Sequence, residues 1–179
     1  MQREFDFLKG LIADFFAKTN LQRGLQIIHE QGITGWEVWL QVEFAYFLSQ
    51  HEAEAEWWRE TIIAFDGRKE SEKMYFKPDF LLRKKGWRKE SYAALEMKQH
   101  PDAASCINNL LKDIVKVSKI KKSELDLRTY WALGVFLRDN KSELKDKLFE
   151  KALIAGVEIH ESMLDIKYIK NTNYAYIIF

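Results

Sequence analysis

Two acidic residues and a lysine interrupt apolar segments in the middle of the chain. Asp79 begins the segment "DFLLRK", and Glu96 and Lys98 lie within "SYAALEMK". Both segments read as strands, and the basic stretch around Gly86 between them is expected to turn. The pattern predicts a hairpin in which Asp79 lies across from Glu96. Because side chains alternate along a strand, Glu96 and Lys98 are expected to share one face.

These side chains suit the chemistry of a divalent metal ion. Two carboxylates placed together repel each other, and one lysine neutralises only one of them. Oxygen ligands from Asp79 and Glu96, with a strand carbonyl such as that of Met97, are typical of Mg²⁺ or Mn²⁺ sites. Such an ion activates a bound water and neutralises charge during phosphodiester hydrolysis. Lys98 is placed to orient or deprotonate that water.

The pair Pro78-Asp79, followed by Glu96-Met97-Lys98, resembles the signature of the PD-(D/E)XK nuclease superfamily, which includes many restriction endonucleases, Holliday-junction resolvases and repair nucleases. The resemblance implies a restriction-endonuclease-like α/β core of the order αβββαβ, a mixed sheet flanked by helices, over about residues 34–138. It also implies a metal-dependent DNA nuclease in which Asp79 and Glu96 bind the metal and Lys98 lies near the water. The alternative is a catalytically silent protein of this fold that binds nucleic acid or a partner protein.

The superfamily also tends to use an acid from the helix before the sheet, and two residues compete for this role. Glu43 has aromatic and aliphatic residues at helical neighbour spacing, which predicts a carboxylate on the apolar stripe. Burying it unpaired would cost several kcal/mol, so a compensating partner is expected. Glu37 lies three residues after Thr34, and the two are expected to form a capping box at the helix start. Glu43 is therefore favoured as a metal ligand, and Glu37 is the alternative.

Basic residues that would contact a DNA backbone occur around the hairpin turn and, at helical spacing, in the segment after the second strand. Residues 71–179 hold 21 Lys and Arg against 15 Asp and Glu, whereas residues 1–70 hold 7 against 12. A polyanion would therefore favour the second part of the chain. For each lysine, the alternative is that it lies on a solvated helix face and binds nothing. Trp87 is expected either to stack on a base or to fold back on the sheet. The candidate residues are Lys84, Lys85, Trp87, Arg88, Lys112, Lys116 and Lys119.

Hydrophobic periodicity predicts the remaining elements. We expect a single domain over residues 1–179, with an N-terminal helical extension (1–33), the core (34–138) and a C-terminal helix and strand (139–179). Helices are predicted at 4–18, 21–31, 34–50, 102–121 and 141–157, and strands at 57–65, 79–84, 91–98, 128–137 and 173–179.

Composition limits the class of protein. The chain has 179 residues, of which 47% are hydrophobic, and no apolar run approaches the length that spans a membrane. Its single cysteine, Cys106, excludes an internal disulfide, and the four histidines are too scattered for a zinc site. We expect a soluble, cytoplasmic protein whose partner is DNA. The Phe-rich first helix or the terminal "YAYIIF" is a candidate homodimer interface.

Overall fold

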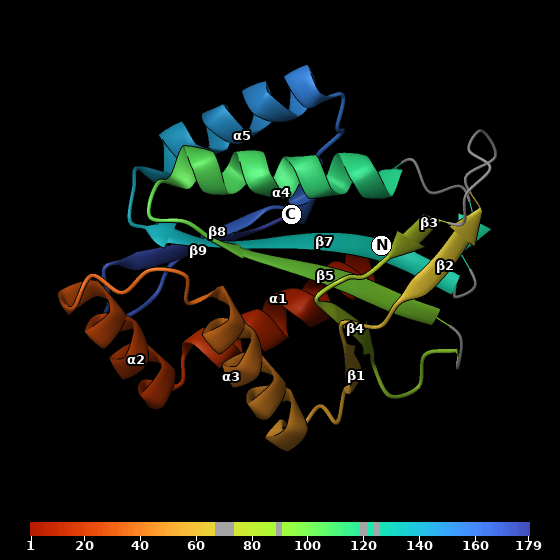
Figure 1. The fold of residues 1–179 in the computed structure, drawn as a ribbon, viewed down its shortest axis with the longest axis horizontal. Coiled ribbons are helices and arrows are strands. Elements are labelled where there is room, and N and C mark those ends of the chain that lie inside the picture. The colour runs from red at the N-terminus through yellow and green to blue at the C-terminus, as the bar shows by residue number, and fades with distance from the viewer. Residues whose placement is uncertain (67–73, 89–90, 119–121, 124–125) are drawn as a thin grey trace.

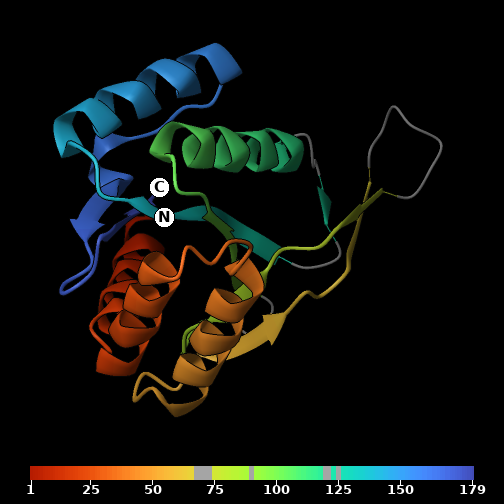
Figure 2. The same ribbon diagram turned by 60° about the vertical axis from the view of Figure 1, so that its left-hand side comes forward.

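The computed structural model describes residues 1–66, 74–88, 91–118, 122–123 and 126–179. A six-stranded mixed sheet runs through the molecule and carries helices on both faces (Figure 1). The three N-terminal helices cover one face, and α4 (Ala103–Ser118) and α5 (Lys141–Ala155) cover the other. Figure 2 shows the same two helical layers from a second direction. The expected α/β class, with a mixed sheet flanked by helices, is therefore confirmed.

The N-terminal helices are α1 (Gln2–Phe16), α2 (Thr19–Glu30) and α3 (Glu37–Gln50). All three were predicted, and α2 ends at Glu30, close to the predicted end at residue 31. The predicted capping box is wrong, because α3 begins at Glu37 and its N-cap residue is Trp36, without a side-chain capping bond. The carboxylate of Glu37 instead reaches the neighbouring strand.

The six strands lie in the order β1 (Glu56–Arg59), β4 (Phe80–Arg83), β5 (Ser91–Gln99), β7 (Asp126–Leu137), β9 (Tyr174–Ile178) and β8 (Asp165–Tyr168). The pair β5 and β7 is parallel, and every other neighbouring pair in this sheet is antiparallel. Parallel neighbours need a crossover connection, which α4 provides above the sheet. The predicted hairpin is confirmed, since β4 and β5 pair across the turn that contains Gly86.

The single strand predicted at residues 57–65 is wrong. The chain leaves β1 at Glu60, which has a φ of 53°, and then enters β2 (Ile63–Asp66). β2 belongs to a separate three-stranded sheet with β3 (Met74–Phe76) and β6 (Lys122–Ser123), neither of which was predicted. A left-handed backbone at a glutamate is not foreseen from strand propensity. The Asp66-Gly67 pair after this segment predicts a turn, which extends outside the described residues.

The C-terminal segment completes the sheet. The α5 helix starts with an Asn140 side chain that accepts a hydrogen bond from the Ser142 N–H, and it ends at Gly156. A short 3₁₀ helix, η1 (Glu161–Met163), then leads into β8, which was not predicted, and β9, which was.

Both segments considered for a dimer interface lie in the core. Residues 174–179 are buried, and so are the phenylalanines Phe5, Phe15 and Phe16 of α1. Their apolar side chains are therefore used inside the fold and are not available for an interface.

The sheet separates two apolar layers. Leu95 and Met97 of β5 pack with the N-terminal helices in one layer, whereas Lys98 of β5 reaches Asp113 of α4. In this second layer, Cys106 of α4 packs with Ala132 of β7. The alternation predicted for β5 is therefore confirmed. Among the residues that the structure describes, no helix is long and apolar enough to cross a lipid bilayer.

Candidate active site

The hairpin brings Asp79 to the strand that carries Glu96 and Lys98. Phe80 pairs with Leu95, so Asp79 lies beside the next residues of β5. The Met97 N–H donates a hydrogen bond of 2.7 Å to Oδ2 of Asp79. The expected proximity of Asp79 to the Glu96-Met97-Lys98 segment is confirmed.

Along one edge of β5, carboxylates accept the backbone hydrogen bonds that a neighbouring strand would otherwise accept. β4 ends its pairing at Leu95, so the backbone of Met97 and Gln99 faces an open edge. Asp79 accepts the N–H of Met97, and Oε2 of Glu37 accepts the N–H of Gln99 at 3.2 Å. In a ladder, the N–H and C=O of one residue point to the same neighbour. The Met97 carbonyl therefore lies at the same edge as both acids.

Lys98 forms ion pairs with three acidic side chains. Its Nζ lies 2.7 Å from Oε1 of Glu96, 3.5 Å from Oε1 of Glu37 and 3.7 Å from Oδ2 of Asp113. We call these three carboxylates, together with Lys98 and with Asp79 at the neighbouring Met97 N–H, the acidic cluster. Negative charge is therefore in excess at this site.

Burial increases the electrostatic strain at the acidic cluster. The Glu96 side chain is only 12% exposed. This burial, together with repulsion from Asp79, raises the pKa of Glu96 to about 7. Burial also raises the pKa of Asp79, although the Met97 N–H opposes the shift. Desolvation of Lys98 would lower its pKa, but the hydrogen bond and attraction to Glu96 outweigh it and raise the pKa, so the lysine stays protonated at neutral pH.

The preference for Glu43 over Glu37 is reversed by this geometry. Glu37 and Gln41 are one helical turn apart and face the sheet, where Gln41 accepts a hydrogen bond of 2.7 Å from Arg59. Glu43 follows Gln41 by about 200° around the helix axis, so it lies on another side of α3. The apolar-stripe argument failed because α3 is apolar on nearly all sides, and even Val42 is 52% exposed.

Two further residues at the site were not anticipated. Asp113 of α4 lies on the helical face that buries Cys106 and Leu110, so helical spacing from these two apolar residues could have revealed it. The Tyr130 hydroxyl is buried close to the Glu96 carboxylate. Burial and the nearby charge of Glu96 raise the pKa of Tyr130.

The basic residues predicted around the hairpin turn have mixed surroundings. Trp87 packs edge-on against Phe7 with ring centroids 5.5 Å apart, so it folds back on the core. Lys84 lies 5.4 Å from the centre of the same Phe7 ring, and Lys85 forms an ion pair with Glu54.

Arg88 and Lys112 are exposed, and Lys116 forms an ion pair with Asp113 at 2.6 Å. Lys119 lies outside the described residues. The exposed basic residues of the hairpin turn and of α4 remain available for phosphate contacts.

The residue types of the acidic cluster fit a hard cation. Buried carboxylates in excess of cations, beside an edge carbonyl, are the oxygen donors that Mg²⁺ and Mn²⁺ prefer. Within the described part of the chain, however, no three acidic, histidine or cysteine side chains are gathered closely enough to hold a metal ion as they stand.

No protein-family model matches this chain, and no curated protein or solved structure is significantly similar to it. A functional proposal therefore depends on the geometry of the site.

Proposed function

We propose that this protein is a metal-dependent nuclease that hydrolyses phosphodiester bonds in DNA, an endonuclease of the PD-(D/E)XK type with a restriction-endonuclease-like core. The main support is the meeting of Asp79, Glu96 and Lys98 at one edge of β5, where Met97 donates its N–H to Asp79. The order of α3, the strands β1, β4 and β5, then α4 and β7 is compatible with the αβββαβ core that the resemblance implies.

The residues at the open edge of β5 have distinct proposed roles. Asp79, Glu96 and the carbonyl of Met97 would hold Mg²⁺ or Mn²⁺, which would supply an activated water and neutralise charge on the phosphate. Lys98 is protonated and hydrogen-bonded to Glu96, so it is suited to orienting the water and the scissile phosphate. Glu37 fixes Lys98 from the helix side and also bonds the Gln99 N–H.

Electrostatics favour a cation at this position. Of the four carboxylates, Asp113 also pairs with Lys116 and Asp79 is attracted by Arg59, so Lys98 is left to offset both Glu96 and Glu37. Two partly buried carboxyl groups with raised pKa values indicate charge that the protein does not fully compensate. A divalent ion would restore the balance, and such uncompensated sites are found most often where chemistry takes place.

A second candidate function is a catalytically silent protein that binds nucleic acid or a partner. The observation that favours it is the set of three carboxylates around Lys98, which can be read as an ion-pair network that needs no metal. This alternative predicts binding that is independent of metal ions and is not accompanied by cleavage.

The test is cleavage by the purified protein. Supercoiled plasmid is incubated with Mg²⁺, Mn²⁺ or EDTA, using wild type, Lys98→Ala and the control Lys145→Ala, whose lysine lies on α5 and pairs with Glu161. We expect nicking or cutting by wild type and by the control with either metal, and none by Lys98→Ala when circular dichroism shows an intact fold. Cleavage that persists in Lys98→Ala would overturn the proposal. A parallel panel of duplex, single-stranded, branched and RNA substrates defines the substrate form.

A further inference from the structure

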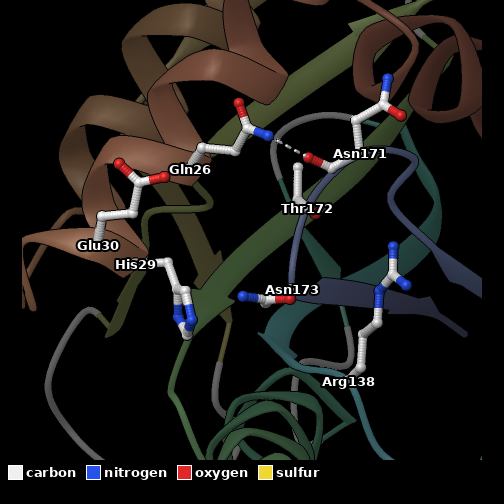
Figure 3. Close-up of a pocket in the computed structure, with 7 residues that line it drawn as sticks. All are labelled: Gln26, His29, Glu30, Arg138, Asn171, Thr172 and Asn173. Carbon is white, nitrogen blue, oxygen red and sulfur yellow. Dashed lines mark hydrogen bonds between the residues drawn. The ribbon is translucent and has the colours of Figure 1, made fainter.

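A second polar site lies away from the acidic cluster. A pocket of about 330 Å³ is enclosed by the end of α2, by Arg138 after β7 and by the turn at residues 171–173 between β8 and β9. Figure 3 shows Arg138 and Glu30 on opposite sides of this pocket, with Asn173 between them. We call it the β-turn pocket. Its volume lies at the lower end of the range seen for small-molecule sites.

Arg138 is held in place at the wall of the β-turn pocket. Its Nη2 donates to the Ile169 carbonyl at 2.8 Å, and its Nε donates to the Tyr174 carbonyl at 3.4 Å. A guanidinium group has five N–H donors, so several remain for a ligand. No carboxylate in the described part of the chain forms an ion pair with Arg138. The guanidinium is therefore positioned in advance for an anion.

A second cation, Lys141, contacts the same aromatic ring as Arg138. The Lys141 Nζ is 4.5 Å from the centre of the Tyr168 ring, and the Arg138 guanidinium carbon is 5.2 Å from the same centre. Within the described residues, neither cation has an acidic partner within ion-pair distance. Two cations that contact one ring without an acidic partner would attract an anion to this part of the surface.

The other walls of the β-turn pocket offer neutral hydrogen-bonding groups. Gln26 donates to the Asn171 carbonyl at 2.7 Å, which ties α2 to the turn. The buried Thr172 hydroxyl donates to the Ile169 carbonyl and fixes the turn from within. The Asn173 side-chain amide has no hydrogen-bond partner in the described structure, so both its donor and its acceptor are available. Amide groups of this kind suit the sugar or base next to a phosphate.

The β-turn pocket and the acidic cluster lie at the same end of two parallel strands. Glu37 bonds the Gln99 N–H at the end of β5, and Arg138 directly follows the end of β7. Trp36, the neighbour of Glu37, packs against Tyr174 with ring centroids 5.4 Å apart. Tyr174 in turn follows Asn173 and supplies the carbonyl that Arg138 binds. One chain of direct contacts therefore connects the two sites.

We propose that the β-turn pocket binds a phosphate group of the DNA strand that reaches the acidic cluster, with Arg138 contacting that phosphate, Lys141 contacting the same strand's backbone from beside the Tyr168 ring, and Asn173 contacting the adjoining nucleoside. This inference rests on the proposed nuclease function for the identity of the strand. Glu30 lies on the opposite wall, so the phosphate is expected on the Arg138 side.

The experiment measures DNA binding without cleavage. A labelled duplex oligonucleotide is titrated with protein in EDTA by fluorescence anisotropy at several salt concentrations, using wild type, Lys141→Gln, Asn173→Asp and the control Lys145→Gln. The control makes the same charge change on the same exposed helix. Each lost phosphate contact lowers the slope of log K against log[salt] by about 0.9 for duplex DNA. We expect that decrease for Lys141→Gln and not for Lys145→Gln, and weaker binding for Asn173→Asp.

Equal slopes for Lys141→Gln, Lys145→Gln and wild type would overturn the inference, as would the absence of any binding by wild type. If only the nuclease proposal is wrong, the result is different. The protein would then not cleave DNA in Mg²⁺, but the difference in salt-dependence slope between Lys141→Gln and Lys145→Gln in EDTA would remain. Inorganic phosphate is added as a competitor in a further series. Displacement of DNA from wild type by phosphate at lower ionic strength than by chloride would support a phosphate subsite, and identical displacement by the two anions at equal ionic strength would contradict it.

Discussion

The carboxylate of Asp79 takes the place of a strand partner for Met97, whose N–H it accepts at 2.7 Å. Glu37 does the same for Gln99 at 3.2 Å. The two acids therefore have a structural role, because they satisfy buried or half-buried backbone donors at an edge that β4 leaves open. The same contacts aim the remaining carboxylate oxygens and the Met97 carbonyl at a common edge, which is where the proposed chemistry takes place.

The contribution of the hydrogen bond between Met97 and Asp79 can be measured separately from that of the Asp79 charge. Asp79→Asn and Asp79→Ala both remove the charge, but only the asparagine retains an oxygen that can accept the Met97 N–H. We expect Asp79→Asn to be more stable than Asp79→Ala by about 1–3 kcal/mol in urea denaturation, which is the penalty for an unsatisfied buried donor. Equal stabilities would show that the hydrogen bond does not contribute.

Glu96 makes the stability of the metal-free protein depend on pH. Its pKa rises from 4.5 in the unfolded chain to about 7 in the folded protein. Between these values the folded state binds more protons than the unfolded state, so stability increases as pH falls from about 8 toward 5. Glu96→Gln mimics the protonated form. In EDTA it should exceed wild type in stability by up to ~3 kcal/mol at pH 8 and by little at pH 5. A constant difference across this range would contradict the pKa shift.

Glu37 and Glu43 provide a matched pair of acids on one helix. Glu37→Gln weakens the hold on Lys98 and should lower the rate of DNA cleavage by about 10–100-fold, as expected for a supporting contact at a metal site. Glu43→Gln should retain the wild-type rate, because Glu43 lies on another side of α3 from Glu37 and Gln41. The measurement is single-turnover cleavage in Mg²⁺. A larger loss in Glu43→Gln than in Glu37→Gln would restore the original preference for Glu43.

Gly134 allows α4 to pack closely behind the site. It pairs with Lys98 across the two parallel strands, and a Cβ there would lie 2.9 Å from both Cys106 Sγ and Leu110 Cδ1. Gly134→Ala should destabilise the protein by about 1–3 kcal/mol through overpacking. The control is Gly10→Ala in α1, where a Cβ would have no neighbour within 4 Å. It should stabilise by roughly 0.5–1 kcal/mol. Thermal denaturation of both variants tests this, and similar effects at both positions would refute the packing argument.

The parts of the fold that could be predicted depend on local patterns. Alternation placed Glu96 and Lys98 on one face of β5, and the hairpin around Gly86 brought Asp79 to them. The division of residues 57–65 between two sheets could not be predicted, because it depends on a left-handed backbone at Glu60. That conformation is fixed by tertiary contacts, including the bond from the Glu60 N–H to the Asp79 carbonyl.

The parts of the site that sequence reasoning missed come from distant segments. Asp113 reaches Lys98 only because α4 crosses above β5, and Tyr130 approaches Glu96 only through the parallel pairing of β5 and β7. Glu37 was assigned a local capping role, although its carboxylate is used 62 residues away at Gln99. The β-turn pocket likewise combines residues from three separated segments, so no short motif could reveal it.

The central claim is that the acidic cluster binds a divalent cation, and calorimetric titration with Mn²⁺ tests it most directly. The wild-type protein, the double variant Asp79→Asn/Glu96→Gln and the control Glu43→Gln are titrated at pH 8, after circular dichroism has shown that all three are folded. We predict saturable binding by wild type and by Glu43→Gln, with at least a tenfold loss of affinity in the double variant. Absence of Mn²⁺ binding by folded wild type, or equal affinity in all three proteins, would contradict the claim.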